Sequence, residues 1–270
     1  MQCFINGSFV DVHDAKVSIS DIGFLRAYGC FEVVRCYDGH LFHLDTHLLR
    51  LASSSALLGL QLPHSQNQLT ELCQRLVLMN HLENAKLRII LTGGVSDSDF
   101  EIGSEPTCAI IPYKLNQVRC QPLKTATSVY ERHLPESKTL NYLPALVERK
   151  KVRLRGFDEP LFTTPNGNVL EGARENFFAV KGRTLITPKT GILHGVTRKV
   201  VLDIAREDFE IEERPLHVSE LASCDGAFLT STVKEIAPIV QIDALEFQIP
   251  ESINLLTARF KDSLLTVAQK

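Results

Sequence analysis

The sequence lacks the features that mark membrane, nucleic-acid-binding and disulfide-stabilised proteins. In its 270 residues no apolar run approaches the roughly 18 residues that a membrane span requires. The N-terminus, Met1-Gln-Cys-Phe-Ile, reads as a strand rather than as a signal peptide. A net charge of −3 offers no basic field to a nucleic acid. We therefore expect no membrane partner and no nucleic-acid partner.

The seven cysteines are odd in number, scattered, and never in C-x-x-C spacing, which argues against a disulfide framework and a zinc site. Four stand among apolar residues and are expected to be buried: Cys3, Cys36, Cys73 and Cys108. His40, His43 and His47 straddle a predicted strand and a helix start, so they read as surface or packing residues rather than metal ligands. We predict no metal site and a reducing compartment, the cytoplasm.

The composition, with 44% hydrophobic and 23% charged residues, is that of an ordinary globular protein of one large or two small domains. Polar residues interrupt the pattern near Leu115 to Gln121. We predict an N-terminal domain at 1–115, a linker at 116–121 and a C-terminal domain at 122–270. Turn signals such as Asn6-Gly7 and Asn166-Gly167 indicate hairpins in both halves, which favours two α+β domains over a repeating βαβ pattern.

The expected elements follow from periodicity and capping residues. Asp45 is predicted to cap a helix that runs to Leu58 and ends at Gly59, and Ser65 to begin a second helix. Further helices are expected at 144–155, ending at Gly156, and from 195 to about 207. Strands are expected at 4–10 (a hairpin), 31–37, 86–92, 108–113, 125–130, 176–180, 184–187 and, as the last, 227–230.

Two residues in the C-terminal half carry distinctive chemistry. Lys138 precedes a helix, and Leu140 and Leu143 predict a partly buried strand end, where burial would free the amine as a nucleophile. Glu171 lies on a predicted strand and is followed by Gly172, which permits close backbone approach. A lysine that forms a Schiff base and a carboxylate that keeps a pyridine nitrogen protonated are the two groups that a pyridoxal phosphate (PLP) enzyme requires. The alternatives are a solvated lysine and an edge-strand charge.

Three further elements could hold a phosphate. The residues Gly195-Val196-Thr197 open a helix, whose free N–H groups and dipole favour an anion. Ser231 and Thr232 follow a strand and supply hydroxyl and amide donors. Arg50, on the helix predicted from Asp45, can offer a guanidinium fork to phosphate oxygens. A helix cap, a strand end and a surface arginine are the alternative interpretations.

The ordered motifs of the chain closely resemble those of the class IV aminotransferases, the fold-type IV PLP enzymes. This family includes branched-chain and D-amino acid aminotransferases and aminodeoxychorismate lyase. The motifs are Ser20-Asp-Ile-Gly-Phe, Tyr28-Gly-Cys-Phe-Glu32, His47-Leu-Leu-Arg-Leu51, Lys138-Thr-Leu-Asn141, Glu171-Gly-Ala-Arg-Glu-Asn-Phe177, Gly195-Val-Thr-Arg198 and Thr230-Ser-Thr-Val-Lys-Glu-Ile236. The resemblance runs over nearly the whole chain and implies the two-domain α+β architecture of D-amino acid aminotransferases.

By this resemblance the cofactor is pyridoxal 5′-phosphate, Lys138 is the catalytic Schiff-base lysine and Glu171 is the partner of the pyridine nitrogen. Arg50 is the phosphate arginine. The remaining cofactor-binding residues are Tyr142, Val196, Thr197, Ser231 and Thr232. Candidate substrate-binding residues are Phe31, Ala173 and Arg174. The family further implies a homodimer that acts on a small-molecule substrate.

The motifs leave the reaction open, because labilising bonds at a substrate α-carbon serves both transamination and elimination. Lys138 and Asn141 stand one residue closer than in typical branched-chain enzymes, and loop 95–100 lacks the arginine and histidine of D-amino acid aminotransferases. The Phe31-Glu32 pair resembles one that is common in transaminases, and this resemblance favours transamination of a small amino acid or amine. The alternatives are 4-amino-4-deoxychorismate lyase, which releases p-aminobenzoate and pyruvate in the folate pathway, and a PLP-binding protein without turnover.

Overall fold

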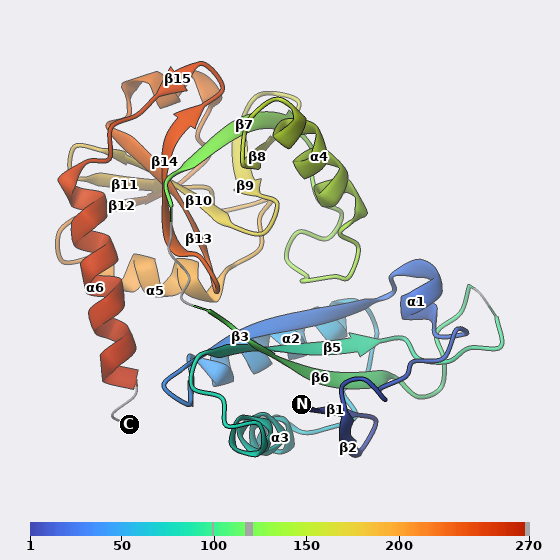
Figure 1. Cartoon of the computed structure of the whole chain (residues 1–270). Coiled ribbons are helices and arrows are strands. Elements are labelled where there is room, and N and C mark those ends of the chain that lie inside the picture. Colours follow the sequence, from blue (N-terminus) through green and yellow to red (C-terminus); the bar gives the residue numbers. More distant parts are fainter. Residues whose placement is uncertain (99, 117–120, 268–270) are drawn as a thin grey trace. The chain divides into compact units, whose positions relative to one another are not determined.

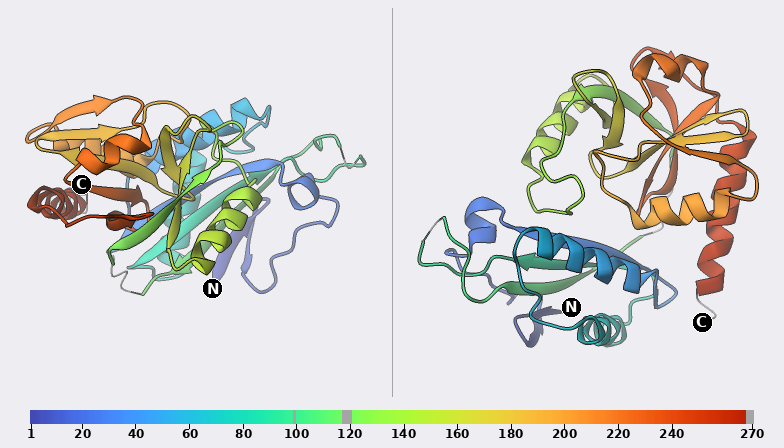
Figure 2. Two further views of the ribbon diagram at one scale, coloured as in Figure 1. Left: turned by 90° about the horizontal axis from the view of Figure 1, so that it is seen from above. Right: turned by 180° about the vertical axis from the view of Figure 1, so that it is seen from behind.

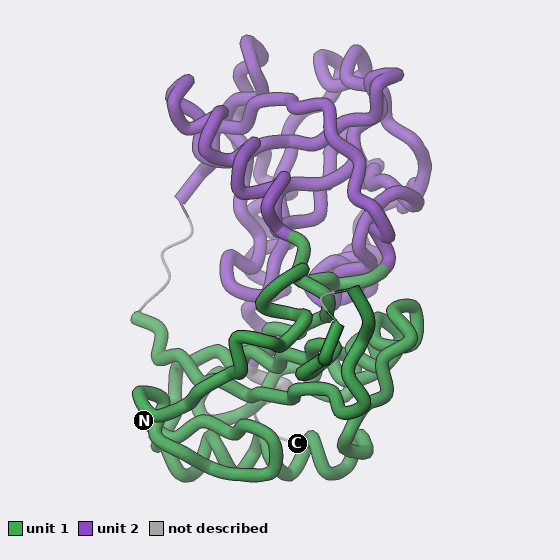
Figure 3. Tube along the Cα trace, turned by 90° about the vertical axis from the view of Figure 1, so that its right-hand side faces the viewer, with its two compact units in different colours: residues 1–117, 137–141, 267–270 green, residues 118–136, 142–266 purple. Residues whose placement is uncertain are grey.

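The computed structural model of the chain describes residues 1–98, 100–116 and 121–267, and these form two compact units (Figure 3). Unit 1 consists of residues 1–117, 137–141 and 267–270, and unit 2 of residues 118–136 and 142–266. The short segment Ser137–Asn141 therefore belongs to unit 1, although the chain on either side of it lies in unit 2. Residues 117–120 of the predicted linker are outside the described residues.

Unit 1 is built on a six-stranded sheet in the order β2-β1-β6-β5-β3-β4, in which every neighbouring pair is antiparallel (Figure 1). Its strands are β1 (Gln2–Ile5), β2 (Ser8–Asp11), β3 (Gly29–Tyr37), β4 (His40–Leu41), β5 (Ala85–Thr92) and β6 (Thr107–Lys114). Asn6 and Gly7 both have positive φ, as the predicted hairpin requires. β3 and β5 are long, neighbouring strands in the interior of this sheet.

Three helices belong to unit 1: α1 (Ile22–Arg26), α2 (Leu44–Leu57) and α3 (Gln66–Met79). The predicted start at Ser65 is confirmed, since its side chain and that of Gln68 form a capping box. The prediction for Asp45 is wrong. The N-cap of α2 is His43, in the left-handed conformation, so Asp45 stands in the first turn, where its charge favours the helix dipole.

The core of unit 1 lies between the sheet and the helices α2 and α3 (Figure 2). Leu48 and Leu51 of α2 pack into the same cluster as Leu69 and Leu76 of α3 and the sheet residue Leu87. The cysteines predicted to be buried, Cys3, Cys36, Cys73 and Cys108, are buried free thiols. One face of the sheet is thus covered by α2 and α3 and forms part of the core.

Unit 2 contains a nine-stranded sheet in the order β12-β11-β10-β13-β14-β7-β8-β9, with β15 on β14. A pairing of Asn176 with Glu171 joins β9 back to β10, so six of these strands form a closed ring. Most pairs are antiparallel, and β7 is parallel to both β8 and β14, as is β11 to β12. The strands are β7 (Leu123–Val129), β8 (Glu159–Thr163), β9 (Val169–Gly172), β10 (Asn176–Lys181), β11 (Thr184–Thr187), β12 (Glu210–Glu213), β13 (Gly226–Ser231), β14 (Glu235–Ile242) and β15 (Leu245–Glu246).

The helices of unit 2 are α4 (Leu143–Leu154), α5 (Val196–Ala205), the 3₁₀ helix η1 (Val218–Ser223) and α6 (Glu251–Val267). Two of them agree with the predicted ranges: α4, with Gly156 at positive φ just beyond it, and α5. The prediction that the strand at 227–230 is the last one is wrong, because β14, β15 and α6 follow it. Within the part of the chain that the structure describes, no helix is both long and apolar enough to span a membrane.

Candidate active site

Arg50 in unit 1 is held by a buried carboxylate. Its Nε and Nη2 donate to Glu32 Oε1 and Oε2 at 2.7 and 2.8 Å, joining α2 to β3. The Glu32 side chain is completely buried, and Nδ1 of His47 lies 2.8 Å from Oε2. Burial alone would raise the pKa of Glu32, but Arg50 and His47 outweigh it and lower the pKa to about 2. The bidentate contact fixes the plane of the guanidinium.

His47 is therefore a packing residue, as the sequence indicates. Burial lowers its pKa, against the opposing effect of the Glu32 carboxylate. Groups of three or more side chains that could bind a metal are absent among the described residues. Glu32 and His47 together hold the guanidinium of Arg50 in place.

Lys138 is attached to unit 1 through its main chain. Its carbonyl accepts from the N–H of Phe31 at 3.0 Å, and its own N–H donates to Ser54 Oγ at 3.1 Å. The ammonium lies 4.8 Å from the centre of the Phe31 ring, so Phe31 and Lys138 are neighbours as well as candidates. The expected burial by Leu143 is wrong, because that side chain is 70% exposed, whereas Leu140 is half-buried.

A second cation, Arg88, approaches the same aromatic ring. Its guanidinium carbon lies 5.7 Å from the centre of the Phe31 ring and 5.8 Å from that of Tyr113. Its buried Nε has no hydrogen-bond partner among the described residues. An unpaired buried donor is costly, so a guanidinium in this state is suited to an anionic acceptor. From the sequence, Arg88 is only one residue of the strand expected at 86–92, and nothing in that pattern indicates its neighbours.

Glu171 in unit 2 is buried at the pairing that closes the ring of strands. Its Oε1 accepts from Arg132 Nε at 2.6 Å, and its Oε2 accepts from Asn176 Nδ2 at 3.2 Å and from the N–H of Leu193 at 3.1 Å. The alternative of an edge-strand charge in water is thereby excluded. Asn176 also donates to the carbonyl of Leu193 at 2.6 Å, which fixes the loop that precedes α5.

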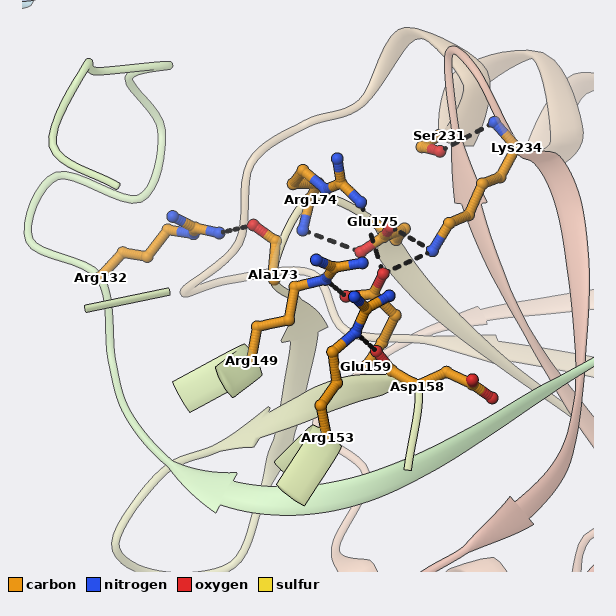
Figure 4. Close-up of polar contacts among 10 residues, drawn as sticks. All are labelled: Arg132, Arg149, Arg153, Asp158, Glu159, Ala173, Arg174, Glu175, Ser231 and Lys234. Atoms are coloured by element: carbon orange, nitrogen blue, oxygen red, sulfur yellow. Dashed lines mark hydrogen bonds and ion pairs between the residues drawn. The ribbon is translucent and has the colours of Figure 1, made fainter. Parts of the chain in front are cut away.

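Sequence reasoning missed Arg132, which Figure 4 shows reaching the carbonyl of Ala173 at 2.6 Å. Its guanidinium carbon lies 5.0 Å from the centre of the Tyr142 ring. Burial would lower the pKa of Arg132, but the charge of Glu171 opposes this effect, and the net result is a raised pKa. Tyr142, one of the predicted cofactor residues, is thus half-buried beside the arginine that holds Glu171. Nothing in the loop 130–136 distinguishes this arginine from a solvated one.

The start of α5 has the features of an anion site. Its N-cap, Gly195, supplies no side-chain cap, and Val196 and Thr197 are buried. A Cβ on Gly195 would overlap Asn176 Oδ1, so the helix start must approach the Glu171 region without a side chain. Strand pairing of Asn176 with Thr230 brings the end of β13 to the same neighbourhood, with Ser231 as its last residue and Thr232 just after it. The N–H groups of this first turn are therefore uncapped by the N-cap residue.

The two remaining candidates differ in exposure. Ala173 is buried in an apolar cluster with Phe162 and Leu170, and only its carbonyl takes part in the polar network. The side chain of Arg174 is 53% exposed and lies 3.4 Å from Glu159. Arg50, Phe31 and Lys138 thus lie in unit 1, whereas the other predicted site residues lie in unit 2.

Comparisons with known proteins identify the family of the chain. The family model of class IV amino-transferases matches residues 29–242. The chain is 34% identical to a putative branched-chain-amino-acid aminotransferase of Methanocaldococcus jannaschii, over 97% of this chain and 96% of that protein. It is 30% identical to the aminodeoxychorismate lyase of Bacillus subtilis, over 97% of this chain and 94% of that protein.

Solved structures show the same fold. The branched-chain aminotransferase of Thermoproteus uzoniensis, determined with norvaline, superposes with a TM-score of 0.91 at 26% identity, over 97% of this chain and 93% of that one. That of Escherichia coli gives 0.87 at 27% identity, over 96% and 93%. The predicted fold-type IV architecture is confirmed. The chain belongs to the class IV aminotransferase family and is an enzyme.

Proposed function

We propose that this enzyme is a pyridoxal phosphate-dependent aminotransferase that acts on an amino acid. The observation that carries the proposal is the buried carboxylate of Glu171, fixed by Arg132, Asn176 and the main chain at Leu193. A carboxylate that is held by several hydrogen bonds in a buried site suits a protonated ring nitrogen better than it suits water. When bound, PLP supplies the electron sink that labilises bonds at a substrate α-carbon.

The groups present fit this cofactor. The first turn of α5 offers main-chain donors and a positive helix end to a phosphate, without competition from an N-cap side chain. The guanidinium of Arg50 is held in one orientation by Glu32 and supplies a positive charge. The residues that we propose to bind PLP are Arg50, Lys138, Tyr142, Glu171, Val196, Thr197, Ser231 and Thr232.

Each proposed role follows from chemistry that the side chain already has. The Lys138 amine would hold the cofactor and, once the substrate amine has displaced it, would move a proton at the substrate α-carbon. Glu171 would pair with the protonated ring nitrogen, and Arg132 holds the Glu171 carboxylate in place. Arg88 lies beside Phe31, its Nε has no hydrogen-bond partner in the described part of the chain, and we assign it to the substrate carboxylate. This assignment favours an amino acid over a simple amine.

Aminodeoxychorismate lyase activity is the second candidate, since a protein of that name is 30% identical to almost the whole chain. Its substrate also carries a carboxylate and reacts at an α-carbon, so the same groups could serve it. We further propose that the enzyme is a cytoplasmic homodimer, in keeping with its family and with the odd, scattered cysteines of the sequence. Light scattering of the purified protein tests the dimer.

Reductive trapping tests the proposal. The protein is incubated with PLP, reduced with borohydride and digested, and the modified peptide is identified by mass spectrometry. We expect modification at Lys138, and we expect Lys138→Ala to lower turnover at least about a hundredfold because both attachment and proton transfer are lost. Modification at another lysine, or full activity of the variant, would refute the assignment.

Product analysis separates the two reactions. An amino-donor screen that forms 2-oxo acids supports transamination. Release of p-aminobenzoate and pyruvate from aminodeoxychorismate, dependent on Lys138, would instead make the enzyme a lyase.

A further inference from the structure

The hairpin turn after β13 contains a half-buried lysine whose ammonium is paired with two buried carboxylates. Lys234 Nζ lies 2.9 Å from Glu159 Oε1 and 2.9 Å from Glu175 Oε1 (Figure 4). The side chains of Glu159 and Glu175 are almost fully buried. All three residues belong to unit 2, and they come from β8, from the turn between β9 and β10, and from the turn between β13 and β14.

Lys234 also closes its own turn. Its N–H donates to Ser231 Oγ at 3.2 Å, across the three residues that connect β13 with β14. Glu235, the next residue, has a φ of +59°, a conformation unfavourable for a residue with a Cβ. A strained turn of this kind keeps its geometry only where its surroundings hold it. The main chain of Lys234 fixes Ser231, and its side chain fixes the turn to the body of the unit.

The carboxylates at the other end of this contact connect to the neighbourhood of Glu171. The Glu175 carbonyl accepts from the N–H of Gly172 at 2.7 Å, and its Oε2 accepts from the N–H of Arg174 at 2.8 Å. Glu175 therefore shapes the turn that follows Glu171. Lys234 links this turn to the one that carries Ser231 and Thr232.

Glu159 is charged in this network. Burial alone would raise its pKa, but hydrogen bonds from Arg149 and Lys234 outweigh burial and lower the pKa. Arg149 Nε lies 2.8 Å from Glu159 Oε2, so Glu159 keeps a cation when Lys234 is removed. Lys234 is the ion-pair partner that the described residues provide to Glu175.

We propose that Lys234 is a positioning residue that holds Ser231 and Thr232 in the geometry required to bind the phosphate of the cofactor. This inference rests on the proposed function, because it assumes that PLP binds at these residues. Lys234 does not touch the cofactor in this role. It acts through the turn, so it should matter for ligands with a phosphate and much less for ligands without one.

The test compares binding of PLP with binding of pyridoxal, which lacks the phosphate, by fluorescence titration of the apoprotein. We expect Lys234→Met to weaken PLP binding at least about tenfold while changing pyridoxal binding by less than about twofold. Lys234→Arg, which keeps the charge, should restore most of the difference. Lys150→Met removes an exposed lysine of α4 and serves as the matched control, with no change in either affinity.

If Lys234→Met does not fold, the double variant Lys234→Met/Glu175→Gln removes the unpaired carboxylate charge together with the lysine. Its PLP affinity should still fall relative to that of Glu175→Gln alone. An equal loss of affinity for both ligands, or no loss for either, would refute the positioning role. Failure of the wild-type protein to bind PLP would instead overturn the proposed function itself.

Discussion

The buried carboxylate of Glu32 should make the stability of this enzyme depend on pH in a defined window. Glu32 is completely enclosed between β3 and α2 and holds both Arg50 and His47. Against the cost of burial, Arg50 and His47 lower its pKa from 4.5 to about 2. The perturbation that tests this account is Glu32→Gln, which keeps the shape of the side chain and removes its charge.

The sign and the size follow from the pKa. A carboxyl whose pKa is lower in the folded than in the unfolded state stabilises the fold above pH 4.5, and this contribution is lost as the pH falls towards about 2. At about 1.4 kcal/mol per pKa unit, the shift corresponds to roughly 3 kcal/mol. His47 also makes the stability of the fold depend on pH. Because its pKa is lowered on folding, its contribution is lost as the pH falls below the ordinary value of 6.5, which is a higher pH range than that of Glu32.

Urea unfolding of the apoprotein measures this contribution. At neutral pH, Glu32→Gln should lower the free energy of unfolding by roughly 3 kcal/mol, and the difference from the wild type should shrink between pH 4.5 and about 2. Glu71→Gln, an exposed carboxylate on α3, is the control and should change stability by no more than about 0.5 kcal/mol. A difference that does not vary with pH, or one no larger than that of the control, would refute the reasoning.

Two further predictions concern the scaffold of the site. Arg132→Met should lower the free energy of unfolding by about 3 kcal/mol because it strands the Glu171 charge, and Arg132→Met/Glu171→Gln should lose less than the sum of the single changes in urea unfolding. Gly94 has a positive φ, and a Cβ added there would overlap the carbonyl of Glu105, so Gly94→Ala should lower the free energy of unfolding by about 3 kcal/mol. Gly59 also has a positive φ but has open space around it, so Gly59→Ala should lower it by about 1 kcal/mol in the same assay. Equal losses in the two glycine variants would contradict the clash.

Local signals predicted much of the fold. Ser65 caps α3 because its hydroxyl and the Gln68 amide satisfy neighbouring main-chain donors, an interaction contained within four residues. The helix α6 was not among the expected elements. Ile253, Leu256 and Phe260 are buried in α6 at helical spacing, so its periodicity was present in the sequence.

Other features depend on contacts that no local pattern contains. Pro238 lies within β14, where its missing N–H argues against a strand, yet its pairing with Phe228 of β13 places it in the sheet. Asp45 was predicted as a cap from residue type alone, but the left-handed conformation of His43 sets the helix start two residues earlier.

In the candidate site, single residues were predictable from the sequence, but their partners were not. Chemistry in single motifs indicated Lys138 and Glu171, because a lysine and a carboxylate are recognisable by type. The partner of Glu171 lies 39 residues away in Arg132, and the partner of Lys234 lies 75 residues away in Glu159. Only the folded strand order brings such pairs together, and a single sequence does not contain that order.

Each unit contains the same kind of ion pair between an arginine and a buried carboxylate. Arg50 pairs with Glu32 in unit 1, and Arg132 pairs with Glu171 in unit 2. The cost of burying each charge is offset only by an opposite charge that is paired with it in good geometry. Removing one residue of the pair therefore destabilises the other. Both arginines use two nitrogens of a planar group at once. A lysine, with a single ammonium, could neutralise either carboxylate but could not fix the orientation of its partner, which is what a cofactor site requires.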